Sequence, residues 1–448
     1  LVRGAGFATP GWTTRASENA KKNKLDKAFA TFMEQEDLNT SLNGVCDLFD
    51  IRTTEGIEAS KNEIRPGGKP QETAKKYLHY TDMLADDNID AVIIATPDHW
   101  HARIIIDAAK AGKHVYCEKG LTRTFDEAVN VYDTVKETGI TFQLGHQNRQ
   151  VEANDQAKQI IDKGVLGPIN MVELTTNRNS PWGAWVWGIH PKANRDTIDW
   201  NTFQEPVVRK NRIPFGDEAL RRFFRWRCWY DYGTGLSGDL LSHDYDTINQ
   251  IMDIGIPKYA SSTGGVYFYK DGRDVPDVWN ATFEFPDKDL TVLYSATLSS
   301  NNARGNRIMG HDATMMMGGQ SGGGSIHGFT VTPDYSSTQY KKRIENGFLN
   351  TNYPMYSYAP GSKQIDGVTS ATSKYFASKG LLYTYRDGKR VDPTHLHIKD
   401  WLDAIRTKSQ PKCNIEVAFH EGVACAMATE SYLQGRRIEW DPVNRRLI

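Results

Sequence analysis

The sequence has little that would cross-link the chain or hold it in a membrane. Its 448 residues include five cysteines, an odd number without a C-x-x-C pair, which argues against a disulfide scaffold and a zinc ribbon. No run of 18 apolar residues occurs, so no membrane-spanning helix is expected. Lys and Arg total 54 against 55 for Asp and Glu, and the formal charge of −1 gives no basic field for nucleic acid or anionic lipid. We expect neither as a partner.

What the chain does contain is typical of a globular protein. Hydrophobic residues make up 39%, and the 11 Trp, 20 Tyr and 17 Phe exclude a disordered chain. At about 150 residues per domain, the length suggests two or three domains. The sequence starts at Leu1 without a secretion signal, and we expect a further segment before it. Localisation therefore stays open between the cytoplasm and the periplasm.

Strand and helix patterns alternate in the first part of the chain. Short apolar runs, each followed by a helical pattern, are typical of parallel strands joined by crossover helices. This alternation predicts a doubly wound parallel sheet, with a nucleotide-binding domain over residues 1–150. The predicted strands are 44–50, 91–95, 114–117 and 141–145, and the predicted helices are 99–111 and 125–137, the last capped by Thr124.

The pattern changes after about residue 165. Alternating strands and turns there predict a largely antiparallel open sheet, so that residues 151–448 form an α+β domain for substrate binding and oligomerisation. The glycine-rich stretch 315–325 lacks G-K-[ST] and is interpreted as a loop or sheet edge, not a phosphate cradle. The predicted strands are 168–178, 259–270, 277–285 and 289–298, and the predicted helices are 397–407 and 417–433.

Ligands of parallel sheets bind beyond the carboxyl ends of the strands. Asp50 ends a predicted strand, where a carboxylate can accept hydrogen bonds from ribose hydroxyls and favour NAD over NADP. Arg52 weakens that preference, and a solvated loop carboxylate is the alternative for Asp50. Gly4 and Gly6 fit G-x-G-x-x loosely but follow only three residues, so we expect the true phosphate loop upstream of Leu1.

Two motifs together resemble a known family. Residues 95–101 (A-T-P-D-H-W-H) and 111–119 (A-G-K-H-V-Y-C-E-K) are similar to the Gfo/Idh/MocA oxidoreductases, the glucose–fructose oxidoreductase and inositol dehydrogenase superfamily. A D-x-x-x-H-x-x-D pattern follows at Asp239, His243 and Asp246. The tail, with H-I-K-D-W-L-D-A from residue 397, fits as well. The resemblance covers most of the chain.

The resemblance implies a catalytic set of Lys119, Asp239 and His243. A dehydrogenase needs a proton acceptor near neutral pH and a cation for the developing alkoxide, roles that suit His243 and Lys119. Asp239 and His243 are spaced i, i+4, so on a helix the carboxylate would orient the ring and raise its basicity. Glycine at position 120, where the family usually has proline, leaves the pose of Lys119 less defined. The expected cofactor contacts are Asp50, Arg52, Thr96, Pro97, Asp98, His99, His101, Glu118, Lys119, His146 and Asn148.

Substrate contacts are expected from the second domain. Arg225 and Tyr232 directly precede the catalytic segment, and Lys119, Arg149, Asp239 and His243 complete the expected substrate-binding set. Four tryptophans between residues 182 and 200 can stack on a sugar ring or form a second aromatic core. His99 and His101 are expected to cover the nicotinamide, and no metal site is expected.

Three functions compete. The leading one is an NAD-dependent dehydrogenase or reductase acting on a hydroxyl of a sugar, glycoside or cyclitol. The second is an NAD-dependent glycosidase that oxidises the sugar transiently, eliminates the aglycone and reduces the sugar again. The third is a silent sugar-binding relative, against which the complete set of Lys119, Asp239 and His243 argues. The family resemblance also implies a homo-oligomer, a dimer or tetramer, formed through the open sheet face.

Overall fold

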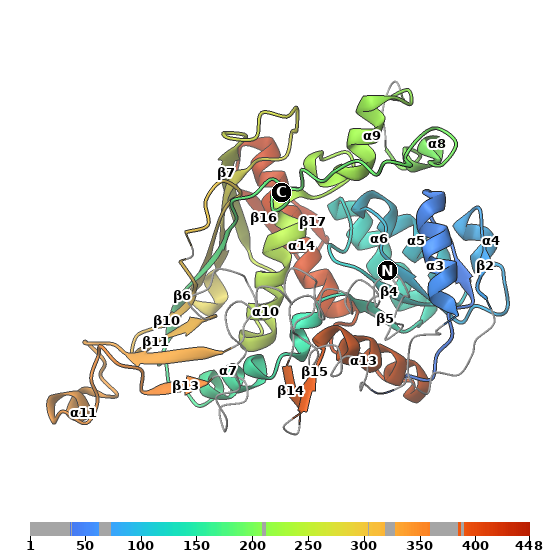
Figure 1. Ribbon diagram of the computed structural model, residues 1–448. Coiled ribbons are helices and arrows are strands. Elements are labelled where there is room, and N and C mark those ends of the chain that lie inside the picture. The colour runs from blue at the N-terminus through green and yellow to red at the C-terminus, as the bar shows by residue number, and fades with distance from the viewer. Residues whose placement is uncertain are drawn as a thin grey trace, which may run out of the picture.

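The computed structural model of the protein describes residues 36, 38–61, 73–207, 212–302, 304–318, 328–358, 384–386 and 389–448. A parallel α/β layer and a large open sheet lie side by side, with long helices between them (Figure 1). The predicted combination of a Rossmann-type domain with an α+β domain is confirmed. Gly4, Gly6 and most of the glycine-rich stretch 315–325 lie outside the described residues.

The first domain contains two parallel sheets. Strands pair in the order β3-β4-β5 in one sheet, and β1 pairs with β2 in the other. β3, β4 and β5 are short and nearly fully apolar because helices cover their faces. The elements are β1 (Gly44–Val45), α3 (Asp50–Ser60), β2 (Lys75–Lys76), α4 (Tyr80–Leu84), β3 (Ala91–Ile94), α5 (Asp98–Lys110), β4 (His114–Cys117), α6 (Phe125–Thr138) and β5 (Phe142–Leu144).

Helix α6 shows how local sequence sets an element's limits. Thr124 accepts a hydrogen bond from the Glu127 backbone, and the Glu127 carboxylate accepts one from the Thr124 backbone, which closes a capping box. Gly139 ends the helix in the left-handed conformation, which glycine adopts without a Cβ clash. The prediction that Thr124 caps this helix is confirmed.

The second domain is built on a ten-stranded sheet among the described residues. Its strand order is β13-β12-β11-β10-β6-β9-β8-β7-β16-β17, and every neighbouring pair is antiparallel except β6 with β9. The strands are β6 (Ile169–Asn177), β7 (Tyr259–Gly265), β8 (Val278–Phe285), β9 (Leu290–Thr297), β10 (Asn306–Gly310), β11 (Ala313–Met317), β12 (Phe329–Pro333), β13 (Tyr356–Tyr358), β16 (Ile438–Asp441) and β17 (Arg446–Leu447), with β14 (Thr384–Arg386) and β15 (Lys389–Val391) in a separate hairpin.

Helices cover one face of the large sheet. Strand β9 alternates buried and partly exposed side chains, and its buried set packs with the helices α10 and α14 into the core. None of the helices in the described part of the chain is both long and apolar enough to cross a membrane. The helical segments are η1 (Gln147–Gln150), α7 (Glu152–Asp162), α8 (Trp200–Phe203), α9 (Asp217–Phe224), η2 (Trp226–Cys228), η3 (Ser237–Leu241), α10 (Ser242–Met252), η4 (Pro286–Lys288), α11 (Lys341–Glu345), α13 (Pro393–Thr407) and α14 (Ile415–Gln434).

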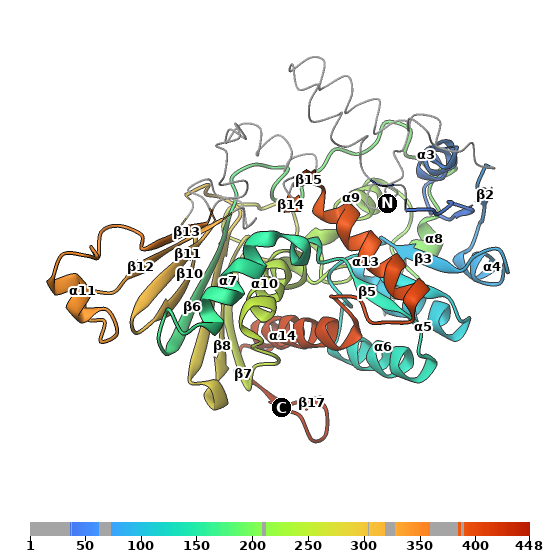
Figure 2. The same cartoon turned by 90° about the horizontal axis from the view of Figure 1, so that it is seen from below.

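Helix α13 departs from the predicted division of the chain at residue 150. It comes late in the sequence, yet it lies against the β3-β4-β5 layer (Figure 2). Trp401 and Ile398 of α13 are buried in one cluster with Tyr116 of β4 and Leu38. The Trp401 and Tyr116 rings meet edge to face at 5.7 Å. By its packing, α13 belongs to the first domain.

The cluster around α13 yields a stability prediction. Trp401→Ala removes a side chain that is 2% exposed and leaves a cavity beside Tyr116. We expect it to lower the free energy of unfolding by about 3–5 kcal/mol. Denaturant unfolding followed by circular dichroism measures this, with Leu433→Ala, whose side chain is exposed, as the control. A loss as small as that of the control would show that α13 does not support the first domain.

Candidate active site

The register of the parallel strands brings three polar side chains to one edge. Ile94, Cys117 and Leu144 are neighbours across β3, β4 and β5. At the same edge, two positions later in each segment, lie Thr96, Lys119 and His146. The carboxyl ends of parallel strands are the usual ligand-binding edge, so these segments form the floor of the candidate site.

Lys119 and Asp239 join the two domains at this edge. The Lys119 ammonium donates to Oδ1 of Asp239 at 2.7 Å and to its backbone carbonyl at 2.8 Å. Arg227 donates through Nε to the same Oδ1 at 2.7 Å. Burial raises the pKa of Asp239, but Arg227 and Lys119 outweigh burial and hold that pKa well below its usual value. Asp239 is therefore an ionised acceptor shared by two cations.

The backbone around Lys119 is closely packed. The Lys119–Gly120 peptide bond is cis. A Cβ at Gly120 would lie 3.3 Å from the carbonyl oxygen of Gly238, one residue before Asp239. Glycine at this position, which the sequence left as a doubt, thus lets the Lys119 loop lie directly on the segment that carries Asp239.

His243 is placed differently from the expectation. Asp239 lies in the π-helical turn η3, which is wider than an α-turn, and its carboxylate faces Lys119 and Arg227 instead of His243. Asp239 raises the pKa of His243, as expected, but it does not outweigh the other neighbours, and its orienting of the His243 ring stays a prediction. Burial, together with Lys119 and His146, lowers the pKa of His243 well below its usual value. The imidazole is neutral at physiological pH and can accept a proton.

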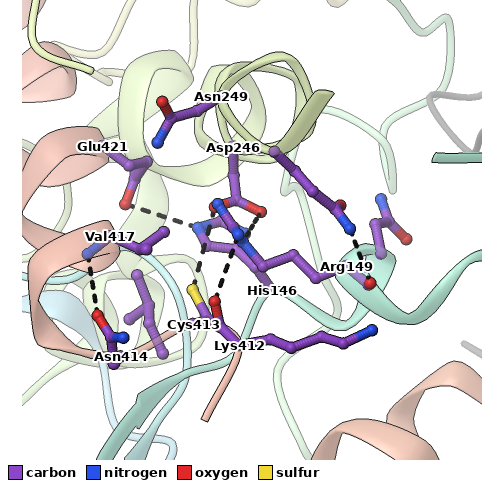
Figure 3. Close-up of polar contacts among 12 residues, drawn as sticks. His146, Arg149, Asp246, Asn249, Lys412, Cys413, Asn414, Val417 and Glu421 are labelled. Carbon is purple, nitrogen blue, oxygen red and sulfur yellow. Dashed lines mark hydrogen bonds and ion pairs between the residues drawn. The ribbon is translucent and has the colours of Figure 1, made fainter. Parts of the chain in front are cut away.

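His146 lies between His243 and a buried carboxylate. The His146 and His243 rings meet edge to face at 5.4 Å, and Nε2 of His146 lies 3.5 Å from Oε2 of Glu421 on α14 (Figure 3). The side chains of His146 and Glu421 are each 1% exposed. Sequence reasoning did not find Glu421, although an acidic residue within the apolar stretch A-F-H-E-G-V-A-C-A is a usable signal.

The guanidinium of Arg149 is held by partners within the protein. Its guanidinium donates through Nε to Asp246 at 2.8 Å and 3.0 Å and through Nη1 to the Lys412 carbonyl at 3.3 Å (Figure 3). The Asp246 side chain is 1% exposed. A buried charge of this kind must be paired, and Asp246 is the partner of Arg149; its contact with a substrate stays a prediction. Asp246, the last residue of the D-x-x-x-H-x-x-D pattern, instead holds the segment after β5 against α10.

The polar side chains at the start of α5 also form hydrogen bonds within the protein. Asp98 accepts from the backbone and the hydroxyl of Thr234 at 3.1 Å and 2.9 Å, and burial raises its pKa. His99 Nε2 lies 2.8 Å from the Phe203 carbonyl, and burial lowers its pKa to about 3. His101 lies between two carbonyls, those of Gly120 at 2.7 Å and Thr96 at 2.9 Å. These buried side chains tie loops and domains together, and their contact with the cofactor stays a prediction.

Asp50 does not end a strand. Strand β1 ends at Val45, and Asp50 opens helix α3, where it is exposed and forms an ion pair with Lys76 at 2.8 Å. Arg52 pairs with the neighbouring Glu55 on the surface at 2.5 Å. The carboxylate nearest the end of β1 is Asp47, and burial raises its pKa to about 6. The sequence V-C-D signals it directly, because Asp47 follows the apolar residues of the strand.

Some of the remaining residues expected to contact substrate or cofactor are buried, and others are exposed. Tyr232 is completely buried against His99 and Phe203, and its contact with a substrate stays a prediction. Arg225 is partly exposed and donates through Nε to the Trp187 carbonyl at 2.7 Å. Asn148, Glu118 and Pro97 stay predictions. Of the four tryptophans, Trp185 and Trp200 belong to the core, and Trp182 and Trp187 remain for a ligand.

Arg227 is a further residue near the candidate site that sequence reasoning did not single out. Its guanidinium lies 4.1 Å from the ring centre of Trp226 and 5.0 Å from that of Trp187 while it binds Asp239. A planar cation suits this position between aromatic faces. Arg227 therefore connects the tryptophan segment to the Lys119–Asp239 pair.

The strand-end segments fit a dinucleotide. The Thr96 hydroxyl is buried and has no hydrogen-bond partner in the described structure, so a polar donor or acceptor is available at the end of β3. A Cβ at Gly145 would lie 3.0 Å from Glu118 Oε2 and 3.1 Å from the Tyr116 hydroxyl, so the bare backbone keeps the end of β5 open. Asp47 supplies a carboxylate at the end of β1, where ribose hydroxyls are bound in Rossmann folds.

Comparison with known proteins agrees with this geometry. Residues 49–146 match the model of an oxidoreductase family with an NAD-binding Rossmann fold. Levoglucosan dehydrogenase of Pseudarthrobacter phenanthrenivorans is 28% identical over 196 residues, 42% of this chain and 41% of that protein. The scyllo-inositol 2-dehydrogenase (NAD(+)) of Bacillus subtilis is 41% identical over 101 residues, 22% of this chain and 30% of that protein.

A third relative is named as a glycosidase. The glycosyl hydrolase family 109 protein 1 of a Shewanella strain is 36% identical over 209 residues, 45% of this chain and 42% of that protein. The matched segments thus span less than half of each of these curated relatives. Among solved structures, levoglucosan dehydrogenase in complex with NADH and levoglucosan has a TM-score of 0.59 at 17% identity, covering 89% of this chain and 90% of that one.

The fold and the strand-end site define a Rossmann-type oxidoreductase architecture with a C-terminal α+β domain. Within that class, residues 49–146 are similar to the Gfo/Idh/MocA oxidoreductase family.

The buried aspartate beside His243 yields a pH prediction. Asp244 accepts from Asn306 at 3.0 Å and from Thr176 at 3.1 Å, and burial raises its pKa to about 7. The unfolded chain ionises this group near pH 3.9, so the folded state holds the extra proton between the two values. Its contribution to the free energy of unfolding is therefore full below pH 4 and falls as the pH rises to 7, by about 4 kcal/mol.

We expect Asp244→Asn to flatten this slope, because the amide does not ionise. Denaturant unfolding at intervals from pH 4 to pH 8 measures it, with the exposed Asp87→Asn as the control. A slope that is identical in the wild type and in Asp244→Asn would contradict the assignment.

Proposed function

We propose that this protein is an NAD-dependent oxidoreductase that acts on a hydroxyl-bearing carbon of a sugar, glycoside or cyclitol. The observation that carries the proposal is the meeting of Lys119 with Asp239 beside the neutral His243 at the strand-end edge. The dehydrogenase names of two relatives, on levoglucosan and on scyllo-inositol, support this substrate class. NADP is the less favoured cofactor because Asp47 places a carboxylate at the ribose end of the sheet.

The chain's own side chains suit the chemistry. NAD, held by the segments around Asp47, Thr96 and Lys119, supplies the hydride acceptor when it is bound. The Lys119 ammonium can donate to the reacting oxygen and stabilise its negative charge as the carbon is oxidised. The neutral His243 can accept the hydroxyl proton. Asp239 is held by two cations and is a poor proton acceptor, so its role is to fix the Lys119 ammonium.

The substrate is expected to lie between this pair and the tryptophan segment. Trp182 is 65% exposed, and its ring lies 6.2 Å from that of Trp187. Exposed indole faces stack on the apolar faces of sugar rings, and the guanidinium of Arg225 can bind hydroxyls. We keep Arg225 as a proposed substrate contact for this reason.

The second candidate function is the redox-recycling glycosidase. The segment shared with the glycosyl hydrolase family 109 protein favours it, since 45% of this chain takes part in that match. In that case the sugar is oxidised, loses its aglycone and is reduced again. The same Lys119 and His243 would serve both functions, so activity decides between them.

One assay separates the two functions. The protein is mixed with NAD and a panel of free sugars, glycosides and cyclitols, and absorbance at 340 nm is followed. We expect a steady rise with at least one sugar or cyclitol, because a dehydrogenase accumulates reduced cofactor. Release of aglycone from a glycoside without a steady rise would establish the glycosidase. No turnover of either kind would refute both.

The site makes a mutational prediction. Lys119→Ala and His243→Ala are each expected to lower kcat by at least ~100-fold, because one removes the cation and the other the proton acceptor. NADH binding, followed by fluorescence, is expected to stay close to wild type in both variants, whereas thermal stability is expected to fall in Lys119→Ala, because the buried Asp239 carboxylate loses one of its two cations. Lys113→Ala, which removes a lysine at the opposite end of β4, serves as the control. A near-wild-type rate in either site variant would overturn the assigned roles.

A further inference from the structure

His243 must accept a proton, but few negatively charged groups without a cation partner lie near it. His243 faces Lys119, Arg178 and the ring of His146, and these neighbours disfavour an imidazolium. Asp239 is close, but Lys119 and Arg227 already share its carboxylate. A proton moving from a substrate hydroxyl to His243 therefore needs a second anion nearby.

Glu421 is the carboxylate in the right place. It projects from α14, is 1% exposed, and Oε1 accepts from the thiol of Cys425 at 3.1 Å. Within the described residues, the one basic group at ion-pair distance from Glu421 is His146, at 3.5 Å. Oε2 of Glu421 and Nε2 of His146 have no other partner there. A buried carboxylate without a cation is costly, and such positions are often kept for function.

His146 lies between Glu421 and His243. Its backbone is fixed by a hydrogen bond from its amide to the Leu144 carbonyl at 2.8 Å. One side of its ring lies against Glu421, and the ring also meets His243 edge to face. The imidazole of His243 makes no hydrogen bond within the described structure. The ring of His146 is therefore the polar neighbour that can fix the orientation of the His243 ring. The order of contacts is thus Glu421, His146, His243.

The other titratable groups around Glu421, His146 and His243 either have partners or are neutral. His397 Nε2 lies 2.8 Å from the Leu144 carbonyl, and burial lowers its pKa to about 3. Arg149 and Asp246 neutralise one another. Burial raises the pKa values of Cys413, Cys425 and Tyr245 well above the usual ones, so these groups stay neutral.

We infer that Glu421 is a positioning residue of the active site, which acts through His146 on His243. It holds the His146 ring against His243 and supplies the negative charge that balances the proton when the substrate hydroxyl gives it up. The proton leaves the substrate oxygen and binds a ring nitrogen of His243, and no other bond changes at these three residues. This inference rests on the proposed function.

The test compares Glu421→Gln, which keeps the shape and removes the charge, with Glu430→Gln on the same helix. Glu430 accepts from Gln434 at the surface and lies away from the row of histidines. With the sugar or cyclitol that the wild type oxidises, we expect Glu421→Gln to lower kcat by roughly 10- to 100-fold, the range for outer partners of functional histidines. KM is expected to change little.

Two readouts exclude a merely structural role. The solvent deuterium isotope effect on kcat is expected to rise in Glu421→Gln, since the proton step becomes slower relative to the others. Glu421→Asp, which restores the charge on a shorter side chain, is expected to recover part of the rate. An unchanged kcat and isotope effect in Glu421→Gln, or a loss of rate that matches a loss of folded protein, would overturn the inference.

A third readout does not depend on turnover. In the protein labelled with ¹⁵N-histidine at pH 7, Glu421→Gln is expected to shift the ring nitrogens of both His146 and His243, and Glu430→Gln neither. His146→Gln assigns the signals. If the wild type oxidises no substrate, the proposed function fails while the ring shifts still decide whether Glu421 acts on the histidines. Unshifted rings in Glu421→Gln would overturn the inference in either case.

Discussion

The carboxylate of Asp239 is the point on which the two domains converge. It comes from the second domain, and one of its oxygens accepts from Lys119 of the first domain and from Arg227 of the second. A buried, ionised carboxylate needs cationic partners in place of water. Removing Lys119 or Arg227 would leave the Asp239 charge under-compensated. The position of the Lys119 ammonium, the approach of the Gly120 loop and the docking of the tryptophan segment all follow from this one acceptor.

Around that point, buried polar contacts replace the solvent at the domain boundary. Asp98 binds Thr234, and Arg149 binds Asp246, each across the boundary between the α/β layer and the helices behind the large sheet. His99 reaches the Phe203 carbonyl in the same way. Such contacts are directional, so they fix how the domains lie against each other more strictly than apolar packing does. The floor of the site and its wall therefore form one framework.

The sequence was sufficient for the fold because its periodicities are local. The apolar run 91–95 and the Thr124 cap predicted β3 and α6 within a residue or two, and the alternating strands predicted the antiparallel sheet. It also singled out Lys119, Asp239 and His243, which lie in motifs and whose catalytic role stays a prediction. It could not show the partners of side chains that pair over long distances. Arg149 and His99 look like ligand-binding residues at strand ends, but their partners are more than 90 residues away.

Two other differences from the predictions have geometric causes. The spacing of Asp239 and His243 predicted a pair on one α-helical face, and the wider π-turn at η3 turns the carboxylate elsewhere. Asp50 was assigned to a strand end because the apolar pattern continues to Phe49, whereas β1 ends at Val45 and leaves that role open to Asp47. Glu421 could not be placed from sequence, since only the tertiary fold brings α14 against His146.

Helix α13 has a consequence for how the chain is made. Its residues Ile398 and Trp401 close the cluster around Tyr116, which lies nearly 300 positions earlier in the chain. A ribosome adds residues from the N-terminus, so the first α/β layer emerges long before its covering helix has been synthesised. During that interval the apolar surface on β4 has no cover. This topology makes the nascent first domain a candidate client for chaperones until α13 has been synthesised.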